Sequence, residues 1–291
     1  MDLGPDVIPV RDAHRFDEAA LAAHLAARVE GFAPPLAVRQ FAGGQSNPSF
    51  LLEAGGRRFV LRKAPPGRLL PSAHLVDREY RVMRALGATG VPVPRTLHLC
   101  EDAALIGTPF FVMEWVPGRI LRDATLPGVP PAERAAIFEA MLDVLARLHA
   151  VDPRAIGLEG FGKPGNYFAR QVARWSEQWA LSKTHEVPAM DALLAWLPRR
   201  VPADDATTLV HGDYRLGNLV LHPSEPRVVA VLDWELSTLG HPLAALAYHC
   251  IFDVIGTGLG EPAGTRPPGI PSEAEVVAGY ARRTGRDTGP H

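Results

Sequence analysis

The segment 208–222, with the sequence TLVHGDYRLGNLVLH, constrains the fold of this chain more than any other. A short apolar run gives way to a loop that carries His211, Asp213 and Asn218, and an apolar run then resumes. A buried strand end gains nothing from an imidazole, a carboxylate and an amide unless these groups have partners. The segment therefore predicts a polar site, and the question is which groups complete it.

A second stretch supplies one such group. Asp233 ends the apolar run RVVAVLD, fifteen residues after Asn218, and the intervening Pro-Ser-Glu-Pro at 223–226 predicts a hairpin. Folding that hairpin brings Asp233 beside Asn218. Two oxygen ligands held in this way suit a hard cation such as Mg²⁺. Asp213 then remains on the loop, where it can orient a nucleophilic hydroxyl.

The spacing of these residues matches the template of phosphoryl transfer. The sequence HGDYRLGN stands where protein kinases carry His-Arg-Asp and, five residues after the Asp, an Asn; LDWE stands where they carry Asp-Phe-Gly. A plainer interpretation is that His211 and Asp213 cap the loop while Asn218 and Asp233 terminate strands. For His211 we favour a role in bracing the loop over a chemical role.

Composition restricts the class of protein. The chain has 291 residues, enough for two modest lobes, and its formal net charge of −2 argues against a nucleic-acid partner. No apolar run approaches the roughly 18 residues of a membrane span, so we expect no membrane partner. Two distant cysteines, Cys100 and Cys250, and an N-terminus without a basic-then-apolar signal pattern favour the cytoplasm.

Periodicity predicts a strand-rich first part and a mainly helical remainder. In the first part we expect a helix over 16–30, strands at 49–54 and 57–64 joined at a Gly-Gly turn, a helix over 74–87, a connector over 91–100 and strands within 104–118. In the remainder we expect helices over 130–152, 166–182 and 190–200, the hairpin that contains 223–226, and a last helix over 272–283 that begins with a capping box.

Two places in the first part could bind a phosphate, and a third supplies a carboxylate partner for the cation. Paired glycines precede Ser46 and Asn47, in a turn whose backbone amides can approach a phosphate, although any hairpin loop can show this pattern. Arg62 and Lys63 are adjacent on a predicted strand and face opposite sides, so only one can enter a cleft; the register favours Arg62. Glu79 lies on the apolar stripe of the next helix, where a carboxylate needs a cation such as Arg62 or Lys63.

These motifs are similar to those of the aminoglycoside phosphotransferase family of small-molecule kinases. The resemblance runs from about residue 35 to 285, is strongest in LVHGDYRLGNLVL and VLDWELSTLGHP, and favours the branch related to the kinase-like part of acyl-CoA dehydrogenase fusion proteins. It implies an α+β, bilobal, protein-kinase-like fold. We expect an N-terminal helical segment at 1–34, a nucleotide-binding N-lobe with a small antiparallel sheet at 35–116, and a larger helical C-lobe at 117–291.

The resemblance also implies roles for individual residues. Asp213 corresponds to the catalytic base, and Asn218 and Asp233 to Mg²⁺ ligands. ATP would be bound through the phosphate-contacting residues above and through an adenine pocket, formed by the main chain of Glu114 and Val116 with Met113 as its lining. The implied activity is transfer of the γ-phosphate of ATP to a hydroxyl of a small-molecule acceptor, with a hydroxyacyl thioester favoured over an antibiotic.

The chain departs from the family pattern at several positions. Arg62 stands where the family usually has Lys, and His241 and Ala245 replace two acids of a GDPLADLA-like segment. Relatives generally continue beyond His291, so the C-lobe is expected to be short or completed by a partner chain, a homodimer being one option. These departures motivate an alternative, a nucleotide-binding module without transfer activity. A protein kinase and a metal-dependent hydrolase built on His211 and Asp213 rank lower.

Overall fold

A computed structural model describes residues 7–43, 47–65, 76–255 and 266–289. Contacts divide the chain into two compact units, each formed by two stretches of sequence. The first unit contains Met1–Ile120 and Asn218–Glu235, and the second contains Leu121–Gly217 and Leu236–His291. None of the described helices has the length and apolar character needed to cross a membrane.

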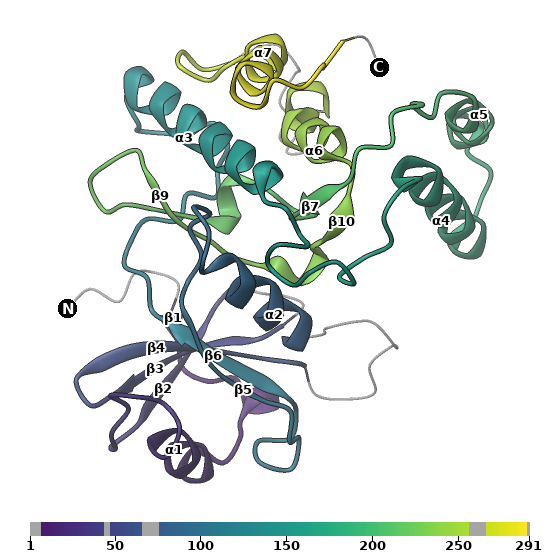
Figure 1. Cartoon of the computed structure of the whole chain (residues 1–291). Coiled ribbons are helices and arrows are strands. Elements are labelled where there is room, and N and C mark those ends of the chain that lie inside the picture. The colour runs from purple at the N-terminus through teal and green to yellow at the C-terminus, as the bar shows by residue number, and fades with distance from the viewer. Residues whose placement is uncertain (1–6, 44–46, 66–75, 256–265, 290–291) are drawn as a thin grey trace. The chain divides into compact units, whose positions relative to one another are not determined.

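The first unit is built on a six-stranded antiparallel sheet (Figure 1). Its strands lie in the order β1-β2-β3-β4-β6-β5, so only the last two depart from chain order. The bounds are β1 Val7–Ile8, β2 Ala37–Phe41, β3 Ser49–Ala54, β4 Arg57–Lys63, β5 Thr96–Cys100 and β6 Phe110–Glu114. The unit also contains the helices α1 (Glu18–Ala26) and α2 (Val76–Leu86) and a short 3₁₀ turn at Asp12–His14.

Alternation along β4 separates two chemical environments. Phe59 and Leu61 belong to the apolar cluster that also contains Leu21 and Leu25 of α1. Arg62, the next residue, points to the opposite face, where its guanidinium contacts α2. The sheet therefore has an apolar face towards α1 and carries a buried cation on the face towards α2.

A β-ribbon from later in the chain completes the first unit. Strands β8 (Leu219–Leu221) and β9 (Val228–Val231) pair as a hairpin, and Leu221 exchanges two backbone hydrogen bonds with Arg119. Gly118 permits this contact, since a Cβ there would lie 2.2 Å from the carbonyl oxygen of Leu221. Two 3₁₀ turns, Leu216–Asn218 and Trp234–Leu236, flank the ribbon.

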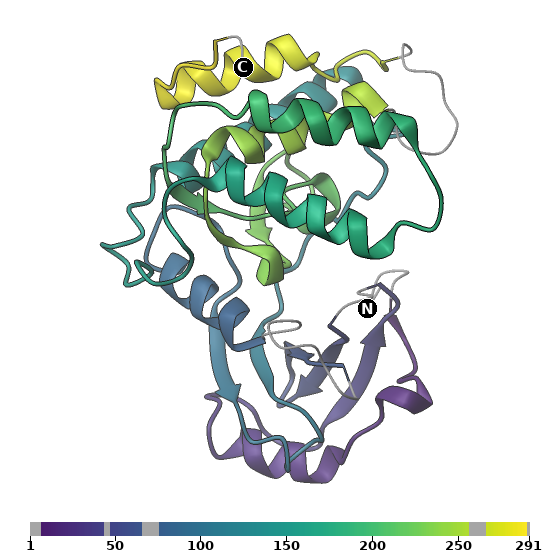
Figure 2. The same cartoon turned by 90° about the vertical axis from the view of Figure 1, so that its right-hand side faces the viewer.

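The second unit is mainly helical (Figure 2). Its long helix α3 is buried along a stripe that includes Ile137, Met141 and Leu145, and it packs against α7. Helix α7 begins at the predicted capping box of Ser272 and Glu275. The elements are α3 Pro131–Ala150, α4 Tyr167–Ser182, α5 Pro188–Trp196, a 3₁₀ turn at Leu197–Arg199, β7 Thr208–Val210, β10 Thr238–Gly240, α6 Pro242–Ile255 and α7 Glu273–Thr284.

The α+β class and most elements are as predicted, but some local predictions are wrong. The segment 91–100 was expected to be a connector because of its prolines, whereas its second half is the strand β5. The helix expected over 16–30 ends at Ala26, and the residues that follow form a turn. The short strands β2 and β10 and the helix α6 were not predicted. Short strands carry too few residues for alternation to show, and α6 follows a proline directly after β10.

Candidate functional site

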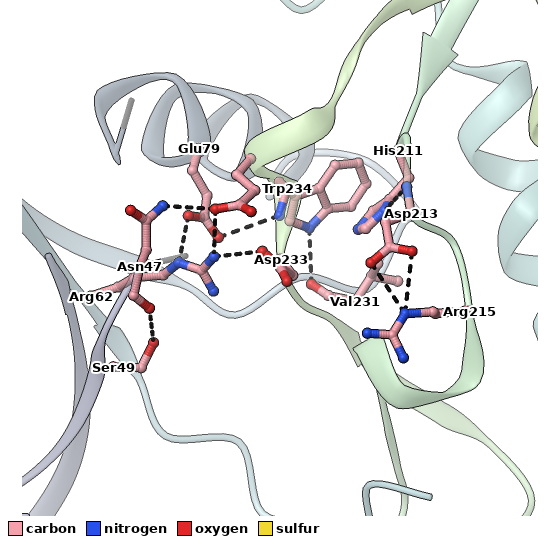
Figure 3. Close-up of polar contacts among 11 residues, drawn as sticks. Asn47, Ser49, Arg62, Glu79, His211, Asp213, Arg215, Val231, Asp233 and Trp234 are labelled. Atoms are coloured by element: carbon pink, nitrogen blue, oxygen red, sulfur yellow. Dashed lines mark hydrogen bonds and ion pairs between the residues drawn. The ribbon is translucent and has the colours of Figure 1, made fainter. Parts of the chain in front are cut away.

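A buried guanidinium organises the candidate site of the first unit (Figure 3). Nε of Arg62 lies 2.8 Å from Oε2 of Glu79, which is the ion pair predicted from sequence. The guanidinium also donates to Oδ1 of Asp233 at 2.5 Å and to Oε2 of Glu235 at 3.3 Å. One cation from the sheet therefore joins a carboxylate of α2 to two carboxylates that follow the ribbon.

Burial sets the electrostatics of this cluster. The Glu79 side chain is 1% exposed, and the loss of hydration raises its pKa to about 7; Arg62 opposes this rise, while Asp233 and Glu235 add to it. Burial would lower the pKa of Arg62, but the charges of its three carboxylate partners outweigh this effect and raise it. Three acids around one cation leave an excess of negative charge, which favours a bound cation.

Glu235 was not among the residues predicted for the site. Its Oε2 accepts a hydrogen bond of 2.9 Å from the side-chain amide of Asn47, which is itself fully buried. Asn47 was expected to contact phosphate, and in the structure its amide binds Glu235. The sequence signal for Glu235 was the second acid of LDWE, two residues after Asp233.

The β8–β9 ribbon brings Asn218 and Asp233 to the same end of the hairpin, as predicted from sequence. The carbonyl oxygen of Asn218 accepts from the backbone N–H of Leu232, the residue before Asp233. Asp233 has a φ of 67°, a left-handed conformation that is costly for a residue with a side chain and that is often found at functional sites. Trp234 holds this turn, since its backbone N–H donates to Glu79 at 3.3 Å and its indole N–H to Val231 at 2.9 Å.

The donor atoms of this region fit a magnesium ion. Asn218 offers an amide oxygen, and Asp233 and Glu235 offer carboxylate oxygens, which are the ligands that Mg²⁺ prefers. No sulfur or imidazole group belongs to the set. The side chain of Asp233 is 30% exposed. The carboxylate that binds Arg62 through Oδ1 is therefore still accessible to an ion from solvent.

The second unit holds Asp213 in a defined orientation (Figure 3). Both of its carboxylate oxygens lie 3.2 Å from Nε of Arg215, and Oδ1 accepts a hydrogen bond of 2.5 Å from the hydroxyl of Tyr248. His211 is buried, and its Nδ1 accepts from the backbone N–H of Asp213, so it braces the loop as predicted. Gly212 has a φ of 89°, and a Cβ there would lie 2.5 Å from the carbonyl oxygen of Leu236.

Tyr248 was missed from sequence because it lies on α6, thirty-five residues after the carboxylate that it binds. Burial raises the pKa of Tyr248 to about 12, and the hydrogen bond to Asp213 adds to the rise. The hydroxyl therefore stays protonated and remains a donor. It limits the orientations that the Asp213 carboxylate can adopt.

Other residues predicted for nucleotide binding lie apart from the Arg62 cluster. Lys63 is on the opposite face of β4, where its ammonium group donates to the carbonyl oxygen of Ile106 and lies over the ring of Phe16. Burial lowers its pKa. Of the two adjacent cations, the structure thus places Arg62 with Glu79. Ser46 lies outside the described residues.

The segment predicted to bind adenine follows β6. Met113 is a buried residue of this strand, and Glu114 is its last residue. The backbone N–H of Glu114 donates to the carbonyl oxygen of Arg95, so this N–H is already bonded within the first unit. Val116 follows in the loop that leads to the bridge at Arg119.

His241 and Ala245, which replace acids of the family pattern, are both buried in the second unit. Nε2 of His241 lies 3.1 Å from a carboxylate oxygen of Asp204, and its Nδ1 accepts from the backbone N–H of Leu243. The imidazole thus braces the start of α6 and also binds an acid that precedes β7.

Comparison with known proteins assigns the fold and the family. The family model described as "Phosphotransferase enzyme family" matches residues 37–289. Rat acyl-CoA dehydrogenase family member 11 is 46% identical over 299 residues, which cover 99% of this chain and 38% of that protein. Mouse acyl-CoA dehydrogenase family member 10 is 49% identical over 248 residues, covering 85% of this chain and 23% of that protein. The chain thus spans well under half the length of these two relatives.

Solved structures support the same assignment of fold and family. A crystal structure of a Ralstonia eutropha protein assigned to the aminoglycoside phosphotransferases is 52% identical, with a TM-score of 0.84, covering 94% of this chain and 82% of that one. An aminoglycoside phosphotransferase in a ternary complex with ADP and hygromycin B is 17% identical, with a TM-score of 0.61, covering 93% and 83% of the two chains, and so shares the fold. The sequence match over most of its length shows that the chain belongs to the phosphotransferase enzyme family, with the kinase-like fold of the aminoglycoside phosphotransferases.

Proposed function

We propose that this chain is a kinase that transfers the γ-phosphate of ATP to a hydroxyl of a small molecule, with Mg²⁺ as cofactor. The observation that carries the proposal is the buried Arg62–Glu79 pair together with the carboxylates of Asp233 and Glu235. Kinases of this general fold require such a cation–glutamate pair between sheet and helix for activity. A protein that needed only structural stability would gain little from burying the Arg62–Glu79 ion pair beside two further carboxylates that are only partly exposed.

Asp213 is the proposed base. A positioned carboxylate can accept the hydroxyl proton of the acceptor as the phosphoryl group is transferred. Arg215 and Tyr248 both bind the Asp213 carboxylate and restrict its orientation before the substrate binds. Less orientational freedom is then lost on reaching the transition state. His211 contributes by fixing the backbone of the loop.

Asn218 and Asp233 are the proposed ligands of Mg²⁺, and Glu235 is a third candidate. When bound, the ion would neutralise phosphate charge and orient the nucleotide. Arg62 is the proposed contact to the α- and β-phosphates, with Glu79 holding its guanidinium. Ser46 and Asn47 near the phosphates, and the main chain of Glu114 and Val116 with Met113 at the adenine, are proposed from the family resemblance.

The acceptor is proposed to be a hydroxyacyl thioester or a related metabolite. Support comes from the relatives named acyl-CoA dehydrogenase family members, although the chain matches only part of each. The charges of the segment 166–197 are mixed, whereas a pocket for a polycationic antibiotic needs acids. A cytoplasmic location and a small-molecule partner are part of the same proposal.

The test is the substitution Asp213→Asn. We expect the rate of phosphate transfer to an acceptor, found by mass spectrometry in a metabolite panel, to fall by about 10²- to 10⁴-fold. Binding of ATP should remain close to that of the unsubstituted chain. Asp152→Asn, at an exposed aspartate of the same unit, is the matched control and should keep full activity. Near-normal turnover of Asp213→Asn would refute the assigned role.

One observation favours a second candidate, a nucleotide-binding module without transfer activity. Arg62 already holds one oxygen of Asp233 at 2.5 Å, and the family usually has Lys at this position. Binding of ATP with no turnover across the whole acceptor panel would favour the module. Loss of ATP that depends on both Mg²⁺ and a metabolite would favour the kinase.

A further inference from the structure

A second polar cluster lies in the first unit, apart from the Arg62 cluster. His24 of α1 and His98 of β5 place their Nε2 atoms 2.9 Å apart, and Sγ of Cys100 is close to both. The three candidate ligand atoms lie within 4.8 Å of one another. No residue of this cluster has a role in the proposed phosphate transfer.

Local structure explains why these side chains meet. His98 and Cys100 are two residues apart on β5, so both point to the same face of the sheet. That face is the apolar one, because Cys100 is in the core cluster with Leu21 and Leu25 of α1. His24 is one helical turn after Leu21 and so lies on the stripe of α1 that meets the sheet.

The geometry points to a binding site for a divalent transition-metal ion of the zinc class, with His24, His98 and Cys100 as its three ligands. Imidazole nitrogen and thiolate sulfur are ligands that Zn²⁺ prefers and that Mg²⁺ does not. Two zinc-bound nitrogens in a tetrahedral site lie about 3.3 Å apart, given Zn–N distances of about 2.05 Å. The histidines need to separate by only a few tenths of an ångström, and water can take the fourth position.

Binding requires a defined change in protonation. The Cys100 thiol loses its proton to solvent as the sulfur–metal bond forms, and the imidazole that carries a proton on Nε2 shifts it to Nδ1. The neutral imidazoles that a metal needs are favoured here. Burial, and then the charge of Arg28, lower the pKa of His24, with Asp102 opposing them; burial, His24 and Arg28 lower the pKa of His98.

The site would connect segments that are far apart in the sequence. His24 and His98 are 74 residues apart, and a shared ion would fix α1 to β5 in the folded chain. Because the unfolded chain does not hold the three ligands together, metal binding should stabilise the folded state. The inference is independent of phosphate transfer, since neither the base nor the Mg²⁺ ligands belong to this cluster.

The experiment is a zinc titration of the full chain against a chromogenic chelator. Excess Mg²⁺ is present throughout, so that the oxygen-ligand site of Asn218 and Asp233 does not compete. We expect one tightly bound Zn²⁺ per chain and a rise in the melting temperature. In Cys100→Ser and His98→Asn the affinity should fall at least tenfold and the thermal shift should disappear. His185→Asn, at an exposed histidine of the second unit, is the matched control and should bind as the unsubstituted chain does.

Co²⁺ provides a second readout that reports the sulfur ligand directly. The unsubstituted chain should show a thiolate-to-cobalt charge-transfer band in the near ultraviolet, and Cys100→Ser should lack it. Thermal unfolding in the absence of metal shows whether each variant folds. If Cys100→Ser or His98→Asn does not fold, His24→Asn, at a half-buried position, is used in its place. Absence of the band, or equal zinc affinity in the unsubstituted chain and the folded variants, would overturn the inference and leave a simple imidazole–imidazole hydrogen bond.

Discussion

At the scale of single residues, the candidate site depends on which way each side chain of one strand points. Arg62 and Lys63 are both buried cations, yet one binds three carboxylates and the other a backbone carbonyl. Alternation along β4 decides this difference, and the apolar neighbours of the strand decide which face is which. Residue type alone would favour Lys63, because the family usually has lysine here.

The buried Glu79 predicts a pH-dependent stability. Its folded pKa of about 7 is above the ordinary value of 4.5, so the folded state holds this proton over a range where the unfolded state has lost it. The stability that Glu79 contributes is complete below about pH 4.5 and falls as the pH rises towards 7, by at most about 3 kcal/mol.

The check is urea unfolding of the unsubstituted chain and of Glu79→Gln at a series of pH values. As the pH rises from 4.5 to 7, the free energy of unfolding of the unsubstituted chain should fall relative to that of Glu79→Gln. Glu53→Gln removes a half-buried glutamate of β3 that is paired with Arg58, and it controls for the loss of an ion-paired glutamate outside the Arg62 cluster. A difference that does not change with pH for Glu79→Gln would mean that Glu79 stays charged throughout this range.

The site residues differ in how far the sequence could predict them. Asp213, Asn218 and Asp233 could be predicted as site residues because strand periodicity and a short turn fix their spacing. Glu235 and Tyr248 were missed because each is defined by a partner more than thirty residues away, Asn47 in one case and Asp213 in the other. Local pattern predicts which residues share an element, but it does not predict which elements pack together.

At the scale of elements, the β8–β9 ribbon is the part that holds the predicted metal ligands. Two backbone hydrogen bonds between Arg119 and Leu221, each 2.8 Å long, help to hold it in the first unit, together with a bond of 2.9 Å from the N–H of Val231 to the carbonyl oxygen of Pro92. The two bonds to Arg119 require close approach of the chain at Gly118. Sequence predicted the ribbon itself from its two apolar runs and its proline turn, whereas its pairing with the segment at 118–119 depends on distant residues.

The substitution Gly118→Ala tests this dependence. The added Cβ would lie 2.2 Å from the carbonyl oxygen of Leu221, so the ribbon must shift and its bonds to Arg119 must weaken. We expect a loss of about 1–3 kcal/mol in the free energy of unfolding, measured with urea. Gly160→Ala, where an added Cβ meets nothing within 4 Å, is the matched control and should change stability by less than about 0.5 kcal/mol. Equal stabilities of the two variants would show that the close approach is unimportant.

At the scale of the whole molecule, the α+β class could be predicted because long periodic segments dominate it. The helices α3, α4 and α7 and the hairpin of β3 and β4 all appear where periodicity and turn residues placed them. The sheet order could not be predicted, since β5 lies at the edge beyond β6 and its own sequence begins just after two closely spaced prolines, Pro92 and Pro94. Sheet order depends on long-range pairing, which leaves little trace in any one segment.

Binding of nucleotide should be visible in the stability of the whole chain. A ligand that binds only the folded state raises the melting temperature, and the size of the rise follows its affinity. If Asp233 holds the Mg²⁺ that accompanies ATP, Mg²⁺ with ATP should raise the melting temperature more than ATP with a chelator does. In Asp233→Asn this extra rise should disappear, because an amide in place of the carboxylate removes the charge that the ion needs.

Asp213→Asn should keep the extra rise, since the proposed base takes no part in binding the metal. A loss in both variants would show that the two aspartates act together in binding, and the separate roles of base and ligand would then be wrong.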